Sequence, residues 1–282
     1  MERTWRTSKR EINYVARPLV MGILNVTPDS FSDGGEFLSV EAALQQAETL
    51  IHDGADIIDI GGESTRPGSQ RVSTEEEIRR VIPVIEAIAK RFDTPISVDT
   101  TKSAVASQAL DMGAEIINDI SGLRFDQRIA EAAAATGAGL VLMHSRGEFE
   151  AMHAQPPVDD IFAEVSTDLR RAIDLAKTCG VRDKQIALDI GIGFSKTQEQ
   201  NLELLAKLDK IVDEFKGYPM MVGTSRKSFI GKVLGDIPAY ERLGGSIATA
   251  LIASQKGACI LRVHDVRETV DALKTAAEIG GL

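Results

Sequence analysis

The stretch Gly54-Ala55-Asp56-Ile57-Ile58-Asp59-Ile60-Gly61 decides the fold. Its glycine stands where a left-handed residue commonly ends a helix, and a short apolar run of strand length follows. The same Gly-Ala step recurs along the chain, at Gly54, Gly113, Gly137 and Gly257. Helix, Gly-Ala and then strand is therefore a repeating unit of local structure, although the sequence itself does not repeat.

Working outward from this stretch, short apolar runs recur over the whole chain. They are Leu19–Met21, Ile57–Ile60, Ile96–Val98, Ile116–Ile117, Leu140–Met143, Ile186–Leu188, Met220–Val222 and Ile260–Val263. Each interval between them can hold a crossover helix, as parallel strands require. One such helix is indicated by Ser73 and Glu76, which have the spacing of a capping box.

Eight β/α units in about 250 residues predict a closed (β/α)8 TIM barrel. The alternative is a doubly wound open sheet, which a G-x-G-x-x-G turn after the first strand would favour, and the sequence has no such turn. No linker or low-complexity segment interrupts the pattern. We therefore expect residues 1–282 to form a single domain.

The overall composition excludes several classes of function. A net charge of −10 argues against a general nucleic-acid binder, which needs a basic surface. No window approaches the ~20 apolar residues of a membrane span, and the basic N-terminus is not followed by the core of a signal peptide. Cys179 and Cys259 lack metal-ligand spacing. We expect a cytoplasmic protein that contacts neither membrane nor nucleic acid.

Polar residues follow almost every expected strand, at the end where barrel enzymes carry their chemistry. In order they are Asn25, Asp59 with Glu63, Asp99, Asn118, His144, Asp189, Ser225 with Lys227, and Arg262 with His264. One polar residue after a strand is commonplace, because strands end in turns. Eight in succession predict a functional ring.

The expected ring has two chemical characters. Asp99, Asn118 and Asp189 are rich in acceptors and suit the amino-pyrimidinone edge of a flat heterocycle, although each alone could be an ordinary rim residue. The cationic set is Arg66, Lys227, Arg262 and His264. Arginine forks suit phosphate oxygens, although Arg66 or Arg262 alone could form a surface salt bridge.

A divalent metal and a carboxylate can also be accommodated. Strands 8, 1 and 2 are neighbours in a closed barrel, so Asn25 should lie near Arg262 and His264, where it could share Mg²⁺ with phosphate oxygens. The segment 224–228 could hold a carboxylate on its backbone N–H groups if it opens a helix. Phe194 lies in a loop expected over the site, or is a buried core residue.

Several segments resemble those of the dihydropteroate synthases. The first is Met21–Gly35, with N-V-T-P-D-S-F-S-D-G-G, and the second is Gly61–Gly68, with G-G-E-S-T-R-P-G. The later ones are Ser97–Thr100, Ile117–Asp119, Gly223–Ser228 and Arg262–Asp265. The resemblance runs from about Val20 to about Leu273, and the first, second and last motifs are long and specific.

This resemblance implies a reaction of folate synthesis. Dihydropterin hydroxymethyl diphosphate and p-aminobenzoate would give dihydropteroate and diphosphate. The implied pterin ligands are Asp99, Asn118, Asp189, Lys227 and Arg262, and all of these except Asn118 are also the implied catalytic residues. The implied diphosphate ligands are Asn25, Thr65, Arg66, Arg262 and His264, with Mg²⁺ on Asn25.

The remaining implications concern the second substrate and assembly. Thr65, Pro67, Phe194 and Ser228 would frame p-aminobenzoate, and Phe31 and Asp33 would close the first loop. A homodimer is likewise implied. One departure is visible: members usually have Asp-Pro-Gly after strand 6, whereas this chain has Asp189-Ile190-Gly191. Loss of a proline predicts a looser loop, by roughly 0.4–1 kcal/mol of unfolded-state entropy.

Two other functions fit parts of the pattern. A pterin-binding methyltransferase that acts with a corrinoid partner shares this barrel, but Arg66, Arg262 and His264 would then lack a purpose. A non-catalytic paralogue that only binds pterin would be expected to have lost loop residues, and the first two loops are complete here. A cobalamin requirement would favour the methyltransferase.

Overall fold

The computed structural model of the chain describes residues 4–14, 17–27, 36–65, 68–152 and 155–280. Its barrel strands are β3 (Leu19–Asn25), β4 (Ile57–Gly61), β5 (Ile96–Asp99), β6 (Ile116–Asp119), β7 (Gly139–Met143), β8 (Ile186–Asp189), β9 (Met220–Val222) and β10 (Ile260–Val263). They close in the order β10-β3-β4-β5-β6-β7-β8-β9, and every neighbouring pair is parallel. The predicted (β/α)8 barrel is confirmed.

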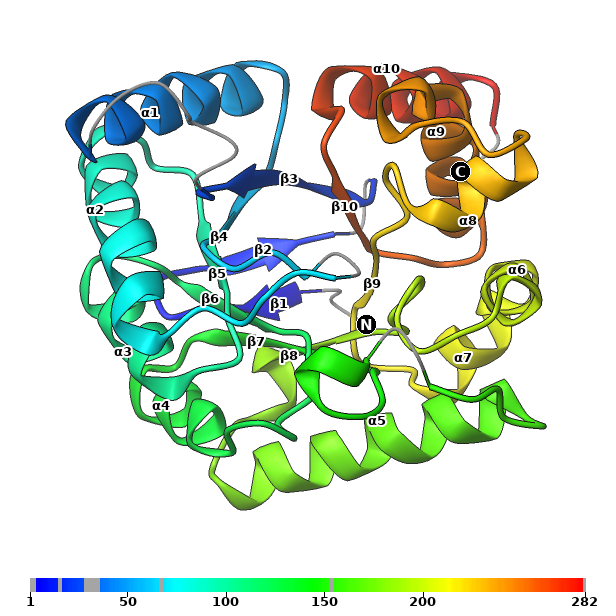
Figure 1. Cartoon of the computed structure of the whole chain (residues 1–282), viewed down its shortest axis with the longest axis horizontal. Helices are drawn as coiled ribbons and strands as arrows, with labels where there is room; N and C mark the ends of the chain where they lie inside the picture. The colour runs from blue at the N-terminus through cyan, green and yellow to red at the C-terminus, as the bar shows by residue number, and fades with distance from the viewer. Residues whose placement is uncertain (1–3, 15–16, 28–35, 66–67, 153–154, 281–282) are drawn as a thin grey trace.

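Helices surround the strands on all sides (Figure 1). They are α1 (Glu36–His52), α2 (Thr74–Arg91), α3 (Ser103–Asp111), α4 (Arg128–Thr136), α5 (Ile161–Thr178), α6 (Gln198–Ala206), α7 (Leu208–Glu214), α8 (Ser228–Val233), α9 (Leu243–Gln255) and α10 (Val266–Glu278). Among the described residues, no helix has the length and apolar character needed to cross a membrane.

Local signals explain several element boundaries. Gly54, Gly113, Gly137 and Gly257 all have positive φ, as residues that end helices in the left-handed conformation do. Ser73 caps α2 by accepting a hydrogen bond from the Glu76 amide. The other half of the expected capping box is wrong, because the Glu76 carboxylate pairs with Arg79 and Arg80 instead.

Alternation along the strands divides the core into two parts. One large cluster fills the layer between strands and helices, and it includes Val20, Ile58 and Leu140. A second cluster fills the barrel interior and includes Met21 and Ile57. Strand side chains alternate between the two faces. The residues two positions after Met21 and Ile57 therefore also project into the interior, nearer the carboxyl ends of their strands.

An N-terminal hairpin, which the sequence pattern did not predict, packs against the interior cluster. It consists of β1 (Thr4–Arg6) and β2 (Glu11–Asn13), and its strands are too short to show a clear alternation. Trp5 is fully buried in the interior cluster, and its Nε1 donates a 2.8 Å hydrogen bond to the carbonyl of Gln185. The hairpin thus covers the amino-terminal end of the barrel, which leaves the carboxyl end for ligands.

Candidate functional site

The carboxyl ends of the eight parallel strands bring the predicted polar residues to one end of the barrel. The register pairs Asp99 of β5 with Asn118 of β6, and Met143 of β7 with Asp189 of β8. On the other side of the barrel, β10 and β3 are neighbours, so Arg262 lies beside the strand that ends at Asn25. Strand closure thereby assembles residues from distant parts of the chain.

Arg262 connects the acidic residues across the barrel mouth. Its Nε donates a 2.6 Å hydrogen bond to Asp59 Oδ2, and its Nη2 donates a 2.7 Å hydrogen bond to Asp99 Oδ2. Asn118 Nδ2 donates to the same Asp59 oxygen at 3.1 Å. Asp59, which was expected in the ring without a binding role, is completely buried. The signal in the sequence was a carboxylate inside the otherwise apolar strand Ile57–Gly61.

These contacts perturb the ionisation of the site. Burial raises the pKa of Asp99 to about 7, although Arg262 opposes the shift. Burial alone would lower the pKa of Arg262, but the carboxylates of Asp59 and Asp99 outweigh burial and raise it. Arg262 therefore stays charged, whereas Asp99 exchanges its proton near neutral pH.

Two acceptor atoms in this network have no hydrogen-bond partner among the described residues. They are Asp59 Oδ1 and Asn118 Oδ1, and both are buried. A buried polar atom without a partner costs about 1–3 kcal/mol, so such atoms at a site point to ligand binding. Either oxygen could accept a hydrogen bond from an N–H donor.

Asp189 and Lys227 belong to the opposite wall. Asp189 Oδ1 accepts a 2.7 Å hydrogen bond from the Gly191 amide, and burial raises the pKa of Asp189. Lys227 Nζ donates to the Ile192 carbonyl and lies 4.8 Å from the centre of the Phe194 ring. Burial lowers the pKa of Lys227 to about 8.

Ile190 stands at the position where proline was expected. Its side chain is completely buried and belongs to the large core cluster. Apolar burial of this kind anchors the start of the loop through packing, which is a different constraint from the fixed φ of a proline.

His264 is oriented by Ser225. The His264 amide donates to Ser225 Oγ at 3.1 Å, and its ring Nδ1 lies 3.0 Å from the same oxygen. These two contacts fix the orientation of the imidazole ring at the end of β10.

Two residues of the expected ring are engaged in structural contacts. Glu63 forms a 3.0 Å ion pair with Lys102, which also pairs with the buried Glu77. His144 is completely buried, and its Nδ1 contacts Lys196 Nζ at 2.8 Å. Position after a strand therefore predicted proximity to the ring but not which side chains line it.

The residues expected around p-aminobenzoate come from three loops. Thr65 is half-buried, Phe194 is 8% exposed and Ser228, the first residue of α8, is exposed. Phe194 packs in an apolar cluster that the sequence analysis missed, with Ile120, Met143, Phe149 and Met152. The expected site residues Arg66 and Pro67, and the expected loop-closing residues Phe31 and Asp33, lie outside the described residues.

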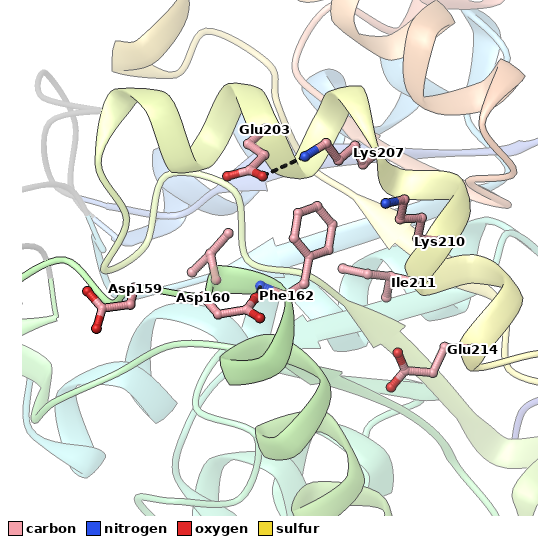
Figure 2. Close-up of a pocket in the computed structure, with 9 residues that line it drawn as sticks. Asp159, Asp160, Phe162, Glu203, Lys207, Lys210, Ile211 and Glu214 are labelled. Atoms are coloured by element: carbon pink, nitrogen blue, oxygen red, sulfur yellow. Dashed lines mark hydrogen bonds and ion pairs between the residues drawn. The ribbon is translucent and has the colours of Figure 1, made fainter.

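A surface hollow of about 460 Å³ lies elsewhere, between the start of α5 and the helices α6 and α7 (Figure 2). Several of its polar groups already have partners: Asp160 caps α5 by accepting from the Phe162 and Ala163 amides, and Lys207 pairs with Glu203 at 2.7 Å. None of the expected site residues lines it. The barrel mouth is therefore the candidate active site.

Comparison with known proteins identifies the family. The family described as "Pterin binding enzyme" matches residues 21–264. Dihydropteroate synthase from Escherichia coli strain K12 is 50% identical over 262 residues, which is 92% of this chain and 91% of that protein.

Solved structures give the same result. Dihydropteroate synthase from Xanthomonas albilineans with 4-aminobenzoic acid has a TM-score of 0.92 and 42% identity, with 100% of both chains covered. The Burkholderia cenocepacia enzyme complexed with 7,8-dihydropteroate has a TM-score of 0.89 and 39% identity, with 99% of this chain and 97% of that one covered. The chain belongs to the dihydropteroate synthase family of pterin-binding enzymes.

Proposed function

We propose that this chain condenses 6-hydroxymethyl-7,8-dihydropterin diphosphate with p-aminobenzoate, giving 7,8-dihydropteroate and diphosphate. Its family membership and relatives that bind 4-aminobenzoic acid and 7,8-dihydropteroate support this reaction. The observation that carries the proposal is the Arg262–Asp59–Asp99–Asn118 network at the barrel mouth. It offers unfilled, buried acceptors beside a permanent cation.

In this proposal the pterin is held by Asp99, Asn118, Asp189, Lys227 and Arg262. The carboxylates and the Asn118 amide accept hydrogen bonds from ring N–H and amino groups, which suits a planar heterocycle. Arg262 and Lys227 donate to the ring acceptors. Lys227 already donates to the Ile192 carbonyl, so its ammonium is held in place beside Phe194 before substrate arrives.

The diphosphate is assigned to Asn25, Thr65, Arg66, Arg262 and His264. Support comes from the pairing of β10 with β3 and of β3 with β4, which places Arg262, Asn25 and the loop that contains Thr65 in sequence around the rim. His264 follows β10 on the same rim, and Ser225 orients its ring, which would offer an N–H group to the anion.

The second substrate is assigned to the loops beside this anion site. Thr65, Pro67, Phe194 and Ser228 frame p-aminobenzoate, and Phe31 and Asp33 belong to the loop that closes over it. Phe194 supplies an aromatic surface backed by Met143 and Ile120, which suits a benzene ring.

The donor set fits Mg²⁺ only if the substrate supplies most of the ligands. Among the described residues, no three His, Cys, Asp or Glu side chains are arranged to hold a metal ion. Asn25, at the end of β3, offers one carboxamide oxygen. Mg²⁺ commonly binds one or two protein oxygens together with phosphate oxygens and water. When bound, it would neutralise charge on the diphosphate and make it a better leaving group.

The protein residues then favour a cation-like path. The methylene C–O bond breaks with its electron pair leaving on diphosphate, and the resulting cation is delocalised into the pterin ring. Asp99 and Asp189 stabilise this cation, while Arg262 and Lys227 hold the ring and the departing anion. The aniline nitrogen forms the new C–N bond and loses one proton, so no strong general base is required.

The corrinoid-dependent methyltransferase is not favoured. The named relatives at 39–50% identity are dihydropteroate synthases. The deciding experiment incubates purified protein with the pterin diphosphate, p-aminobenzoate and Mg²⁺, and measures diphosphate release and dihydropteroate. Product formation without cobalamin supports the proposal. Turnover only with a corrinoid, or pterin binding without turnover, would replace it.

We also propose a cytoplasmic homodimer whose protomer is one domain spanning residues 1–282. Exposed apolar side chains gather on α8, α9 and the segment between them: Val233, Leu234, Tyr240, Leu243 and Ile252. Gly245 of α9 lies directly against Ile230 of α8, so the two helices are neighbours. Apolar patches of this kind commonly mark interfaces. Sedimentation equilibrium of the parent and Val233→Asp tests the assignment, because only the parent should dimerise.

A further inference from the structure

Lys196 occupies the loop between β8 and α6, residues 190–197, and its ammonium group makes three contacts. Its Nζ lies 2.8 Å from His144 Nδ1, 2.7 Å from the Gly191 carbonyl oxygen and 2.9 Å from the Phe194 carbonyl oxygen. Burial lowers the pKa of Lys196, whereas these three acceptors favour its protonated form, in which each N–H donor finds one acceptor. One side chain thus fastens both ends of the Gly191–Phe194 turn to the end of β7.

The turn needs such fastening because its backbone is unusual. Gly191, Gly193 and Ser195 have φ of 65°, 85° and 55°, and Ser195 is not a glycine. A non-glycine residue persists there when its surroundings fix it. Gly191 lies so close to β7 that a Cβ would stand 1.9 Å from the His144 carbonyl oxygen. The path of the loop is therefore determined by its contacts with the segment that follows β7.

His144 is suited to act as the fixed acceptor. It is completely buried, and burial together with the nearby Lys196 charge lowers its pKa to about 2, so its ring is neutral. The His144 amide donates a 2.9 Å hydrogen bond to the Asp189 carbonyl, which ties the same two strands together at the same level. Neither His144 nor Lys196 has a role in the reaction proposed above.

A second lysine holds the turn from the other side. Lys227 donates to the Ile192 carbonyl and lies over the Phe194 ring. Gly191, Ile192 and Phe194 therefore each offer a carbonyl to one of two lysines, with Lys196 behind the turn and Lys227 toward the site. Both lysines are half-buried, and their acceptors lie on opposite sides of the same short turn.

We propose that Lys196, seated on His144, is a positioning residue that fixes the Gly191–Phe194 turn and so sets the Phe194 wall of the p-aminobenzoate pocket. The inference rests on the proposed function. It assigns Lys196 no contact with substrate. The contacts of Lys196 with His144, Gly191 and Phe194 are called the clamp below. The diphosphate ligands on β10 and β3 belong to other elements, so loss of the clamp should weaken p-aminobenzoate binding more than diphosphate binding.

Steady-state kinetics of Lys196→Met provide the first test. Methionine keeps an unbranched apolar stem and removes all three donors. We expect KM for p-aminobenzoate to rise about tenfold, while Kd for Mg²⁺-pyrophosphate by calorimetry changes less than about twofold. Lys207→Met is the matched control, since Lys207 forms an exposed ion pair with Glu203 away from the loop. It should match the parent in both measurements.

Kinetics of His144→Leu provide the second test. The leucine variant removes one acceptor but leaves both loop carbonyls to Lys196, so KM should rise in the same direction by about threefold. If Lys196→Met does not fold, this variant decides. Parental KM for p-aminobenzoate in the folded variants, or equal weakening of p-aminobenzoate and pyrophosphate, would overturn the proposal.

Amide hydrogen exchange tests whether Lys196 fixes the turn, independently of any activity measurement. The amides of Gly191, Gly193 and Phe194 are hydrogen-bonded within or beside the turn. Their exchange should be about tenfold faster in Lys196→Met than in the parent, and unchanged in Lys207→Met. If exchange is faster in Lys196→Met but the parent protein itself forms no dihydropteroate, the role of Lys196 in fixing the turn stands and the proposed function is removed. Unchanged exchange would remove the clamp.

Discussion

Arg262 and Asp59 are 203 positions apart in the sequence, yet the guanidinium Nε of one donates a 2.6 Å hydrogen bond to the carboxylate of the other. Asp59 is completely buried and Arg262 also binds Asp99. The pair lies on the first and last parts of a closed barrel, separated only by β3. Arg262 therefore neutralises two buried carboxylates, and the proposed function gives it a second purpose as a ligand of the diphosphate.

Arg262→Ala and His264→Ala should both weaken anion binding but should differ in their effect on stability. Arg262→Ala should weaken Mg²⁺-pyrophosphate binding by roughly ten- to a hundredfold, since a charge-assisted hydrogen bond contributes about 1.5–3 kcal/mol. It should also lower the melting temperature, because Asp59 and Asp99 lose their shared cation. His264→Ala should weaken pyrophosphate and leave the melting temperature nearly unchanged. Calorimetric titration and thermal unfolding measure both effects, and unchanged affinity in both variants would remove the anion-site assignment.

The free energy of unfolding of the unliganded protein should depend on pH through the ionisation of Asp99. Its pKa is raised from 3.8 to about 7, so the folded state binds more protons than the unfolded state between these values. The contribution of Asp99 to stability is thus greatest below pH 3.8 and is lost as the pH rises through about 7. Comparing the pH dependence of unfolding free energy in the parent and Asp99→Asn isolates it. Superimposable slopes would show that the carboxyl is not perturbed.

Activity should rise with pH on the acid side, whereas the contribution of Asp99 to stability falls. The proposed pterin site uses the ionised Asp99 as an acceptor, so kcat/KM for the pterin diphosphate should rise through about pH 7. It should fall through about pH 8 as Lys227 loses its proton. We expect a bell-shaped profile whose acid limb disappears in Asp99→Asn. A flat profile between pH 6 and pH 9 would contradict both assignments.

Asp189→Asn should keep the fold and lower turnover. Asparagine can still accept from the Gly191 amide, so the local hydrogen bond at 2.7 Å is retained while the negative charge is lost. Loss of one charge-assisted contact to the pterin costs about 1.5–3 kcal/mol, or roughly ten- to a hundredfold in rate. Asp209→Asn, at an exposed ion pair with Lys256, is the control. Parental turnover in a folded Asp189→Asn would exclude it as a pterin ligand.

Binding of p-aminobenzoate should depend on the diphosphate site. Its expected pocket takes Thr65 from the loop after β4, and the anion is expected to order that loop and the one after β3 through Asn25 and Arg66. The first ligand then bears part of the ordering entropy that the second would otherwise bear, which is positive coupling. Mg²⁺-pyrophosphate should tighten p-aminobenzoate binding by roughly 5- to 150-fold. Equal affinity with and without it would mean that the pocket is formed beforehand.

The sequence by itself determined the barrel and the end of it at which the polar residues gather. Apolar runs of strand length, glycines that end helices and polar residues after each strand are local signals, because they follow from backbone conformation and from the position of turns. They placed Asp99, Asn118, Asp189 and Arg262 at the right end of the fold. The long motifs around Asn25, Thr65 and His264 indicated the family, which the relatives confirm.

Only the tertiary structure decided which of these side chains meet. From the sequence, Arg262 was expected to bind pterin and diphosphate and Asp59 was only a member of the ring, whereas closure of the barrel joins Arg262 to Asp59 and Asp99. Likewise, His144 was expected in the ring but is buried beneath Lys196, and the N-terminal hairpin was not predicted. Register, depth along the strand and loop packing set these pairings, and each depends on residues far apart in the chain. Local sequence therefore specifies the chemistry available at the barrel mouth, and long-range packing decides which groups are left free to bind a ligand.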